Sequence, residues 1–125
     1  MSDLPAQTPS STVSSNRLLI VEDHALLRES LRMVAESVGH FAEVSEVGSL
    51  AGALIELGAR LELPRLIMLD LGLPDAEGPT ALHVIGQRYP AAPVLVVSGL
   101  DEPRAIDEAF ALGARGYVPK NSSAR

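Results

Sequence analysis

The chain has 125 residues, 46% of them hydrophobic, which is enough for one domain with one core and leaves no room for a second. Its formal net charge of −6 argues against binding nucleic acid through this segment, because proteins that bind phosphate backbones carry a basic surface. There is no cysteine, no apolar run of membrane-spanning length and no secretory signal, so we expect a cytoplasmic protein without membrane contact.

The first part of the chain divides into a polar leader and a strand–helix unit. Residues 1–16 contain nine Ser, Thr or Pro, which predicts a disordered leader and a folded domain over residues 17–125. Residues 17–21 predict a buried strand that ends at two acids, Glu22 and Asp23. Residues 24–38 predict an amphipathic helix that Gly39 ends. Its expected inward residues are Leu26, Leu27, Leu31, Val34, Ala35 and Val38.

Strands and helices then alternate to the end of the chain. The predicted elements are an edge strand over 41–47, a helix over 50–60 capped by Ser49, a buried strand over 65–69, a helix over 80–89, a strand over 93–97, a helix from 101 or 102 to 112 and a strand over 116–118. The inward helix residues expected are Leu50, Ala53, Leu54 and Leu57, then Leu82, Ile85 and Tyr89, then Ile106, Ala109 and Phe110. Gly72, Pro74 and Gly78 predict a loop after the third strand.

This alternation predicts an α/β fold, a doubly wound parallel sheet of five strands with right-handed crossovers. By analogy with flavodoxin-like proteins we expect the strand order 2-1-3-4-5. Four strands then end at the same edge of the sheet, where ligands bind in such folds. The residues delivered there are Glu22 and Asp23, Asp70, Ser98 and Lys120.

The residue types at this edge favour phosphoryl transfer. Clustered acids repel one another unless a hard cation neutralises them, and an incomplete set of oxygen ligands suits Mg²⁺. A carboxylate such as Asp70 can attack phosphorus to give an aspartyl phosphate, while the Lys120 ammonium and the metal neutralise the phosphoryl oxygens. The Ser98 hydroxyl can then donate to the new phosphoryl group, and its movement would report the covalent state.

Four segments resemble the receiver domains of bacterial two-component response regulators. They are Val21-Glu-Asp-His24, Leu69-Asp-Leu-Gly-Leu-Pro-Asp75, Val97-Ser-Gly99 and Ala111-Leu-Gly-Ala-Arg-Gly-Tyr-Val-Pro-Lys120, and the likeness extends over roughly residues 17–121. His24 and the DLGLPD loop are most similar to the NarL/LuxR subfamily. The implied fold is the flavodoxin-like, CheY-like receiver.

The resemblance implies a role for each site residue. Asp70 is the phosphoacceptor, Ser98 the hydroxyl switch, Tyr117 the aromatic whose rotamer follows it, and Lys120 the phosphate-binding lysine. Mg²⁺ is bound by Asp23 and Asp70, by Glu22 through water, and by the Gly72 carbonyl.

The same resemblance implies partners and an output. The phosphoryl donor is a sensor histidine kinase. The chain is not an enzyme, although it assists its own dephosphorylation. It is the N-terminal part of a transcriptional regulator whose missing C-terminal helix-turn-helix domain binds DNA.

The chain departs from the family after Lys120. Receivers continue into a fifth helix, whereas only Asn121-Ser-Ser-Ala-Arg125 follows here, which reads as a cap and a first turn. Either the chain is a piece of a longer regulator, which we favour, or the helix is absent by nature. In the second case an apolar surface should be exposed and favour homodimers.

Several alternatives stay open. A degenerate receiver would act as a phosphorylation-independent interaction module. An FMN binder should carry a Ser/Thr/Gly-rich phosphate loop where this chain has Glu22-Asp-His24. An aspartyl phosphatase would want a second acid at the position of Gly72. The plain reading of His24 is a solvent-facing residue, and that of Asp75 and Glu77 is a solvated loop.

Overall fold

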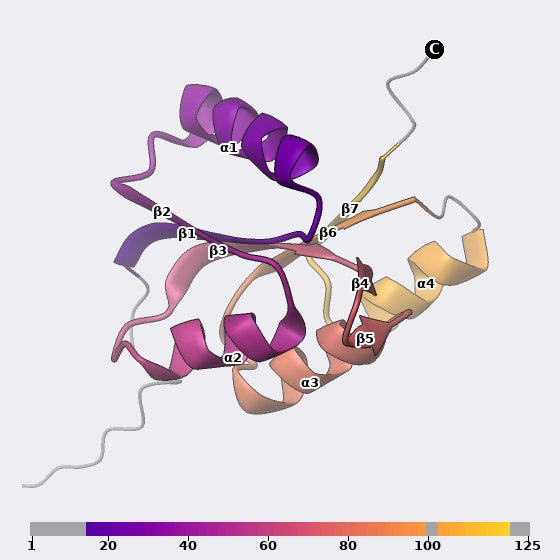
Figure 1. The fold of residues 1–125 in the computed structure, drawn as a ribbon. Helices are drawn as coiled ribbons and strands as arrows, with labels where there is room; N and C mark the ends of the chain where they lie inside the picture. The colour runs from indigo at the N-terminus through magenta and orange to yellow at the C-terminus, as the bar shows by residue number, and fades with distance from the viewer. Residues whose placement is uncertain (1–14, 100–102, 121–125) are drawn as a thin grey trace, which may run out of the picture.

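A computed structural model describes residues 15–99 and 103–120, and within them the fold is a parallel five-stranded sheet flanked by helices (Figure 1). The strands in sheet order are β2 (Glu43–Val47), β1 (Ser15–Val21), β3 (Pro64–Asp70), β6 (Val94–Ser98) and β7 (Gly116–Pro119). The helices are α1 (Ala25–Gly39), α2 (Leu50–Gly58), α3 (Thr80–Arg88) and α4 (Pro103–Ala111). Two short strands, β4 (Gly72–Leu73) and β5 (Ala76–Glu77), form a separate hairpin, and without them the order is 2-1-3-4-5, which confirms the prediction.

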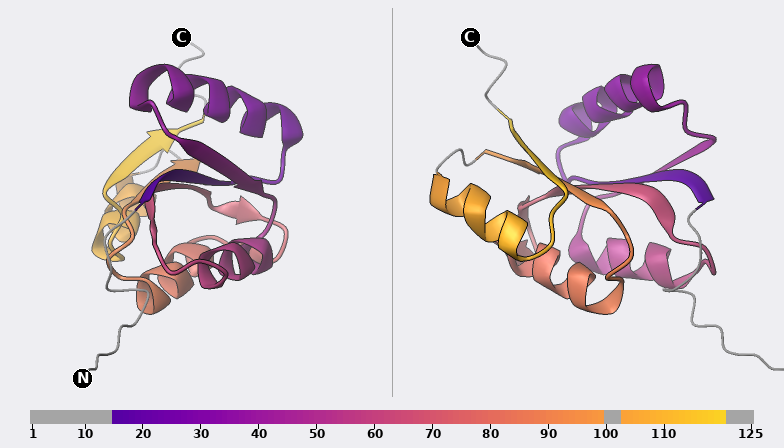
Figure 2. Two further views of the ribbon diagram at one scale, coloured as in Figure 1. Left: turned by 90° about the vertical axis from the view of Figure 1, so that its left-hand side faces the viewer. Right: turned by 180° about the vertical axis from the view of Figure 1, so that it is seen from behind.

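The helices lie on both faces of the sheet. Helix α1 covers one face, and α2, α3 and α4 cover the other, as the views from the side and from behind also show (Figure 2). Both faces of β1 are buried: Leu18 and Ile20 belong to the core under α1, while Leu19 and Val21 belong to the larger core under α2, α3 and α4. Burial on both faces explains why β1 reads as an uninterrupted apolar run.

Helix α1 buries less of its apolar face than its sequence pattern predicts. Ala35 is buried, but Leu26, Val34 and Val38 are 80%, 60% and 75% exposed. No second helix lies beside α1 on its face of the sheet within the described residues. An apolar groove of about 420 Å³ therefore opens there, lined by Val34, Ala35, Val38, Gly39, Phe41, Arg65, Leu66, Met68 and Leu95.

The predicted end of α1 was wrong by one residue. The helix includes Gly39, and the left-handed residue is His40, with φ of 53°. Gly39 is closely approached by a neighbouring side chain, because a Cβ there would overlap the ring of Phe41 unless that ring moved. That ring also lies 4.2 Å from the guanidinium carbon of Arg65.

Other boundaries differ in smaller ways. Strand β1 begins at Ser15, two residues before its predicted start, and the rest of the predicted leader lies outside the described residues, as does the predicted start of α4. Phe110 was expected inward on α4 but is 48% exposed, whereas Ala109 is buried. Helix α3 ends at Arg88, one residue before its predicted end, and the half-buried Tyr89 directly follows it.

Two features of the chain around α2 position the site. Ser49 caps α2 as predicted, with its hydroxyl accepting from the Gly52 amide at 3.0 Å. The loop predicted after β3 contains a small antiparallel hairpin, β4 (Gly72–Leu73) and β5 (Ala76–Glu77), that sequence periodicity did not indicate.

No helix among the described residues is long and apolar enough to cross a bilayer.

Candidate functional site

Two buried carboxylates meet where β1 and β3 end. Asp70 is the last residue of β3 and is 2% exposed, and Glu22, directly after β1, is fully buried. The main chain of Glu22 is held on both sides: its amide donates to the Val47 carbonyl at 3.0 Å, and its carbonyl accepts from Arg28 Nη1 at 2.9 Å. The acids therefore stand on fixed backbone at the edge of the sheet that the sequence predicted.

Lys120, which directly follows the edge strand β7, reaches both carboxylates with its ammonium group. Its Nζ lies 2.9 Å from Asp70 Oδ1 and 3.3 Å from Glu22 Oε1. Its main-chain amide donates to the Ser98 carbonyl at 2.6 Å, which brings the ends of β6 and β7 together. Burial alone lowers the pKa of the Lys120 ammonium, but hydrogen bonding and charge from Asp70, with a further contribution from Glu22, outweigh it and raise the pKa above 10.5.

This raised pKa predicts a pH dependence of stability. Because the folded-state pKa exceeds the unfolded value, the stabilisation from Lys120 is complete below the unfolded pKa and is lost as the pH rises through the folded one. Urea unfolding of the native chain and of Lys120→Met, followed by circular dichroism between about pH 8 and about pH 12, should show the two free energies converging at the alkaline end. A constant difference across that range would contradict the prediction.

A cavity of about 280 Å³ opens above Asp70. Its lining residues are Asp70, Leu71, Gly72, Gly78, Ser98, Gly99 and Lys120. Asp70 Oδ1 accepts from the Gly72 amide at 3.1 Å, but the buried Oδ2 has no hydrogen-bond partner among the described residues. A buried carboxylate oxygen without a partner is costly, so it is suited to an electrophile or a cation that enters the cavity.

The acids also fit a divalent cation. Glu22, Asp23 and His24 offer ligand atoms within 4.8 Å of one another. Glu22 Oε1 pairs with the Lys120 ammonium at 3.3 Å but accepts no hydrogen bond among the described residues. Carboxylate and carbonyl oxygens are the ligands that Mg²⁺ prefers, whereas imidazole suits softer metals. Of this cluster, Glu22 and Asp23 therefore suit a hard cation such as Mg²⁺ better than His24 does. His24 is 73% exposed in its side chain, in accord with its plain reading, and contacts Glu22 Oε2 at 3.2 Å.

Of the two predicted switch residues, only Ser98 lines the cavity above Asp70. Ser98 is 3% exposed and shares the cavity with Asp70 and Lys120. Tyr117 lies on β7 opposite Val96, is half-buried, and packs against the larger core rather than lining the cavity. The structure thus brings Asp70, Gly72, Ser98 and Lys120 to one cavity. Lys120 links Glu22 to Asp70, and Asp23 lies beside Glu22, whereas Tyr117 does not line the cavity.

Sequence reasoning missed two residues that support the site. Arg28 on α1 binds the Glu22 carbonyl and pairs with Glu46 at 3.2 Å. Asp75 is exposed, as a solvated loop residue would be, yet its carboxylate accepts from two amides of α2. Both contacts join segments that are distant in sequence, so no local pattern could indicate them.

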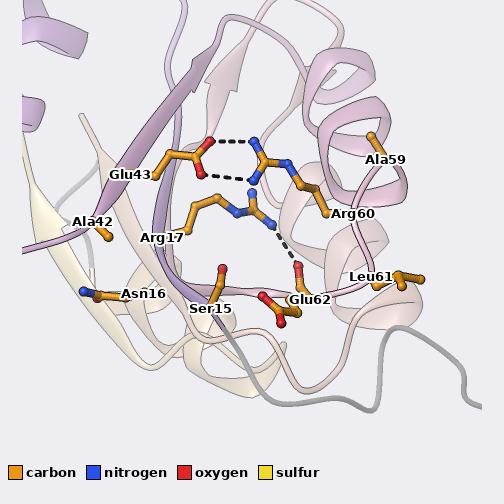
Figure 3. A pocket seen from close by; sticks show the side chains of 9 residues that line it. All are labelled: Ser15, Asn16, Arg17, Ala42, Glu43, Ala59, Arg60, Leu61 and Glu62. Carbon is orange, nitrogen blue, oxygen red and sulfur yellow. Dashed lines mark hydrogen bonds and ion pairs between the residues drawn. The ribbon is translucent and has the colours of Figure 1, made fainter.

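A larger cavity of about 530 Å³ lies at the opposite edge of the sheet and contains none of the predicted site residues (Figure 3). Its two arginines are both bound by neighbouring groups. Both nitrogens of the Arg60 fork bind Glu43, and the buried Arg17 donates to the Glu62 carbonyl at 2.8 Å. These contacts tie β1 and β2 to the segment after α2.

The chain matches a family model and several known proteins. The model, described as response regulator receiver domain, matches residues 18–125. Transcriptional regulatory protein YdfI of Bacillus subtilis is 31% identical over 110 residues, which cover 86% of this chain and 49% of that protein. KDP operon transcriptional regulatory protein KdpE of Escherichia coli is 38% identical over 103 residues, covering 82% and 44%.

Solved structures agree in fold. The crystal structure of a LuxR-family two-component response regulator from Aurantimonas sp. SI85-9A1 matches with a TM-score of 0.76 and 31% identity, covering 88% of this chain and 77% of that one. The chain spans about half the length of the curated relatives it matches. With the family model matching nearly the whole described fold, the chain belongs to the receiver domain family of response regulators.

Proposed function

We propose that the chain is a phosphorylation-controlled switch in which Asp70 accepts a phosphoryl group from the phosphohistidine of a sensor kinase. The observation that carries this proposal is the state of the Asp70 carboxylate. It is buried, Oδ1 is held by Lys120 and Gly72, and Oδ2 has no hydrogen-bond partner among the described residues. One oxygen is thus anchored while the other is available to attack phosphorus.

In the proposed step, Asp70 Oδ2 forms a bond to phosphorus while the bond from phosphorus to the histidine nitrogen breaks. The electron pair of the broken bond stays with that nitrogen, and the product is an aspartyl phosphate. Asp23, Asp70, the Gly72 carbonyl and, through water, Glu22 would hold Mg²⁺, which would supply charge neutralisation for the phosphoryl oxygens. Lys120 supplies a second positive charge within reach of the same oxygens.

The proposed conformational switch depends on Ser98 at the end of β6 and Tyr117 on β7. Ser98 lines the same cavity as Asp70, so its hydroxyl is within the region that a phosphoryl group would enter. Donation to that group would draw the end of β6 toward β3. We propose that Tyr117 then changes rotamer and alters the surface formed by α4 and β7.

The proposed context is a transcriptional regulator. YdfI and KdpE are named as transcriptional regulatory proteins, and the chain spans about half of each. We propose that it acts in the cytoplasm as the N-terminal part of such a regulator. Its partners are then a sensor histidine kinase, a second copy of the chain and, through a separate C-terminal domain, DNA. The chain turns over no substrate, although it assists its own dephosphorylation.

Phosphorylation by a small donor tests this function. The chain is incubated with phosphoramidate, which carries a P–N bond like that of phosphohistidine, with and without Mg²⁺, and its intact mass is measured. We expect the native chain to gain one phosphoryl group only when Mg²⁺ is present, and Asp70→Asn to gain none. No gain in a chain that is folded by circular dichroism would favour the phosphorylation-independent interaction module instead.

A further inference from the structure

Asp75 links two parts of the chain that are far apart in sequence. It lies in the turn between β4 and β5, and its Oδ1 and Oδ2 accept from the amides of Leu50 and Ala51, each at 2.9 Å. These are the first two residues of α2, whose next amide, that of Gly52, is satisfied by Ser49. The free amides at the start of α2 are therefore capped from two directions, one local and one from the hairpin.

The hairpin side of this link adjoins the phosphoacceptor. The hairpin begins at Gly72, whose amide donates to Asp70 Oδ1 at 3.1 Å. The backbone there is so near the carboxylate that a Cβ added at Gly72 would lie 3.7 Å from both Asp70 oxygens. Gly72 is therefore both the first residue of the hairpin and a direct contact of Asp70.

The α2 side of the link adjoins the other acids. The loop before α2 begins at Gly48, where an added Cβ would lie 3.7 Å from Asp23 Cα and 3.9 Å from the Glu22 carbonyl oxygen. The residue before it, Val47, accepts the hydrogen bond from the Glu22 amide. Asp75 thus connects two segments: the hairpin, which contacts Asp70, and the loop before α2, which lies beside Glu22 and Asp23.

The link is charged under ordinary conditions. The two amide hydrogen bonds, from Ala51 and Leu50, hold the pKa of the Asp75 carboxyl below its usual value of 3.8. A carboxylate at the start of a helix is also favoured by the partial positive charge of the helix end. Asp75 is therefore an ionised acceptor for both amides throughout the neutral pH range.

We propose that Asp75 is a positioning residue, which holds the hairpin on α2 and so fixes the Gly72 carbonyl relative to Glu22 and Asp23 for Mg²⁺ binding. This inference rests on the proposed function, because Mg²⁺ binding is part of that function. Without the link, the Gly72 carbonyl and the acid pair would be ordered separately, and the ion would have to bring them together at a cost in affinity.

Three variants separate positioning from capping and from charge. Asp75→Asn keeps the shape of the side chain but turns an NH₂ donor toward an amide that needs an acceptor. Glu77→Gln removes the same charge from an exposed residue of the same hairpin. Ser49→Ala removes the local cap of α2 and leaves the contact with the hairpin intact.

Two measurements are made on each full-length variant. Amide hydrogen exchange of residues 72–77 without Mg²⁺ reports whether the hairpin is held, and isothermal titration with MgCl₂ reports the Mg²⁺ dissociation constant. We expect Asp75→Asn to speed exchange in the hairpin and to raise the dissociation constant about tenfold, as when residues that orient metal ligands are replaced. Glu77→Gln should change neither quantity, and Ser49→Ala should lower the melting temperature alone.

The outcomes are distinct. If Asp75→Asn leaves hairpin exchange or the Mg²⁺ dissociation constant at the native value, the positioning role is wrong. An equal rise of the dissociation constant in Ser49→Ala would also overturn it, because capping alone would then explain the effect. A native chain that binds no Mg²⁺ would overturn the proposed function and the positioning role together, whereas failure of Asp75→Asn alone overturns only the second.

Discussion

Replacement of Lys120 by methionine should lower the free energy of unfolding by about 3 kcal/mol in the absence of Mg²⁺, the lower end of the cost of breaking a buried ion pair. The ammonium lies 2.9 Å from Asp70 and 3.3 Å from Glu22, and both carboxylates are almost fully buried. Methionine fills a similar volume without a charge, so the two acids would repel each other without compensation. We choose the lower end because the Lys120 side chain is itself 23% exposed.

A double variant checks the cause. Adding Asp70→Asn to Lys120→Met removes one of the two repelling charges and should recover part of the lost stability in urea unfolding. Saturating Mg²⁺ should also recover part of it, because the cation replaces the missing positive charge. The phosphorylation rate of Lys120→Met should still fall about 100-fold, since a charge that faces the phosphoryl oxygens is lost. Unchanged stability would show that Lys120 does not neutralise the acids.

Mg²⁺ itself should stabilise the native chain strongly. A ligand that binds only the folded state at 100 times its dissociation constant adds about 2.7 kcal/mol to the free energy of unfolding. The site presents two buried carboxylates paired with one lysine, and the partly exposed Asp23 follows the first of them, so a cation relieves net negative charge there. Thermal unfolding at a series of MgCl₂ concentrations, at constant ionic strength, measures the effect.

The control for this prediction is a pair of charge-matched variants. Asp23→Asn removes a ligand and should abolish most of the shift in melting temperature, whereas Glu29→Gln removes an exposed acid of α1 outside the site and should retain it. Equal shifts in both variants would mean that Mg²⁺ acts on the overall negative charge rather than at the site.

The strand order was expected by analogy with flavodoxin-like proteins, whereas the strands themselves and the main site residues could be predicted because the relevant signals are local. The apolar strands end directly at the functional residues, as at Val21 before Glu22 and at Leu69 before Asp70. Parallel strands in one sheet bring such ends to one edge, whatever the loops between them do. The position of Lys120 beside Asp70 followed from this rule and needed no knowledge of side-chain contacts.

The features that could not be predicted depend on contacts between distant segments. The periodicity of α1 shows which residues are apolar, but whether Val34 and Val38 are covered depends on what packs beside the helix. Gly39 looked like a helix terminator, but it is the last residue of α1, and the Phe41 ring lies where its Cβ would be. Asp75 binds amides that lie 24 and 25 residues away, and nothing in its neighbours indicates a partner.

The assignment of Asp70 as the phosphoacceptor can be tested at the level of the single residue. The native chain is treated with phosphoramidate and Mg²⁺, reduced with borohydride, which converts an aspartyl phosphate into homoserine, and digested for peptide sequencing by mass spectrometry. We predict homoserine at position 70 and at no other acid. Homoserine at another position, or none in a chain that has gained a phosphoryl group, would contradict the proposed role of Asp70.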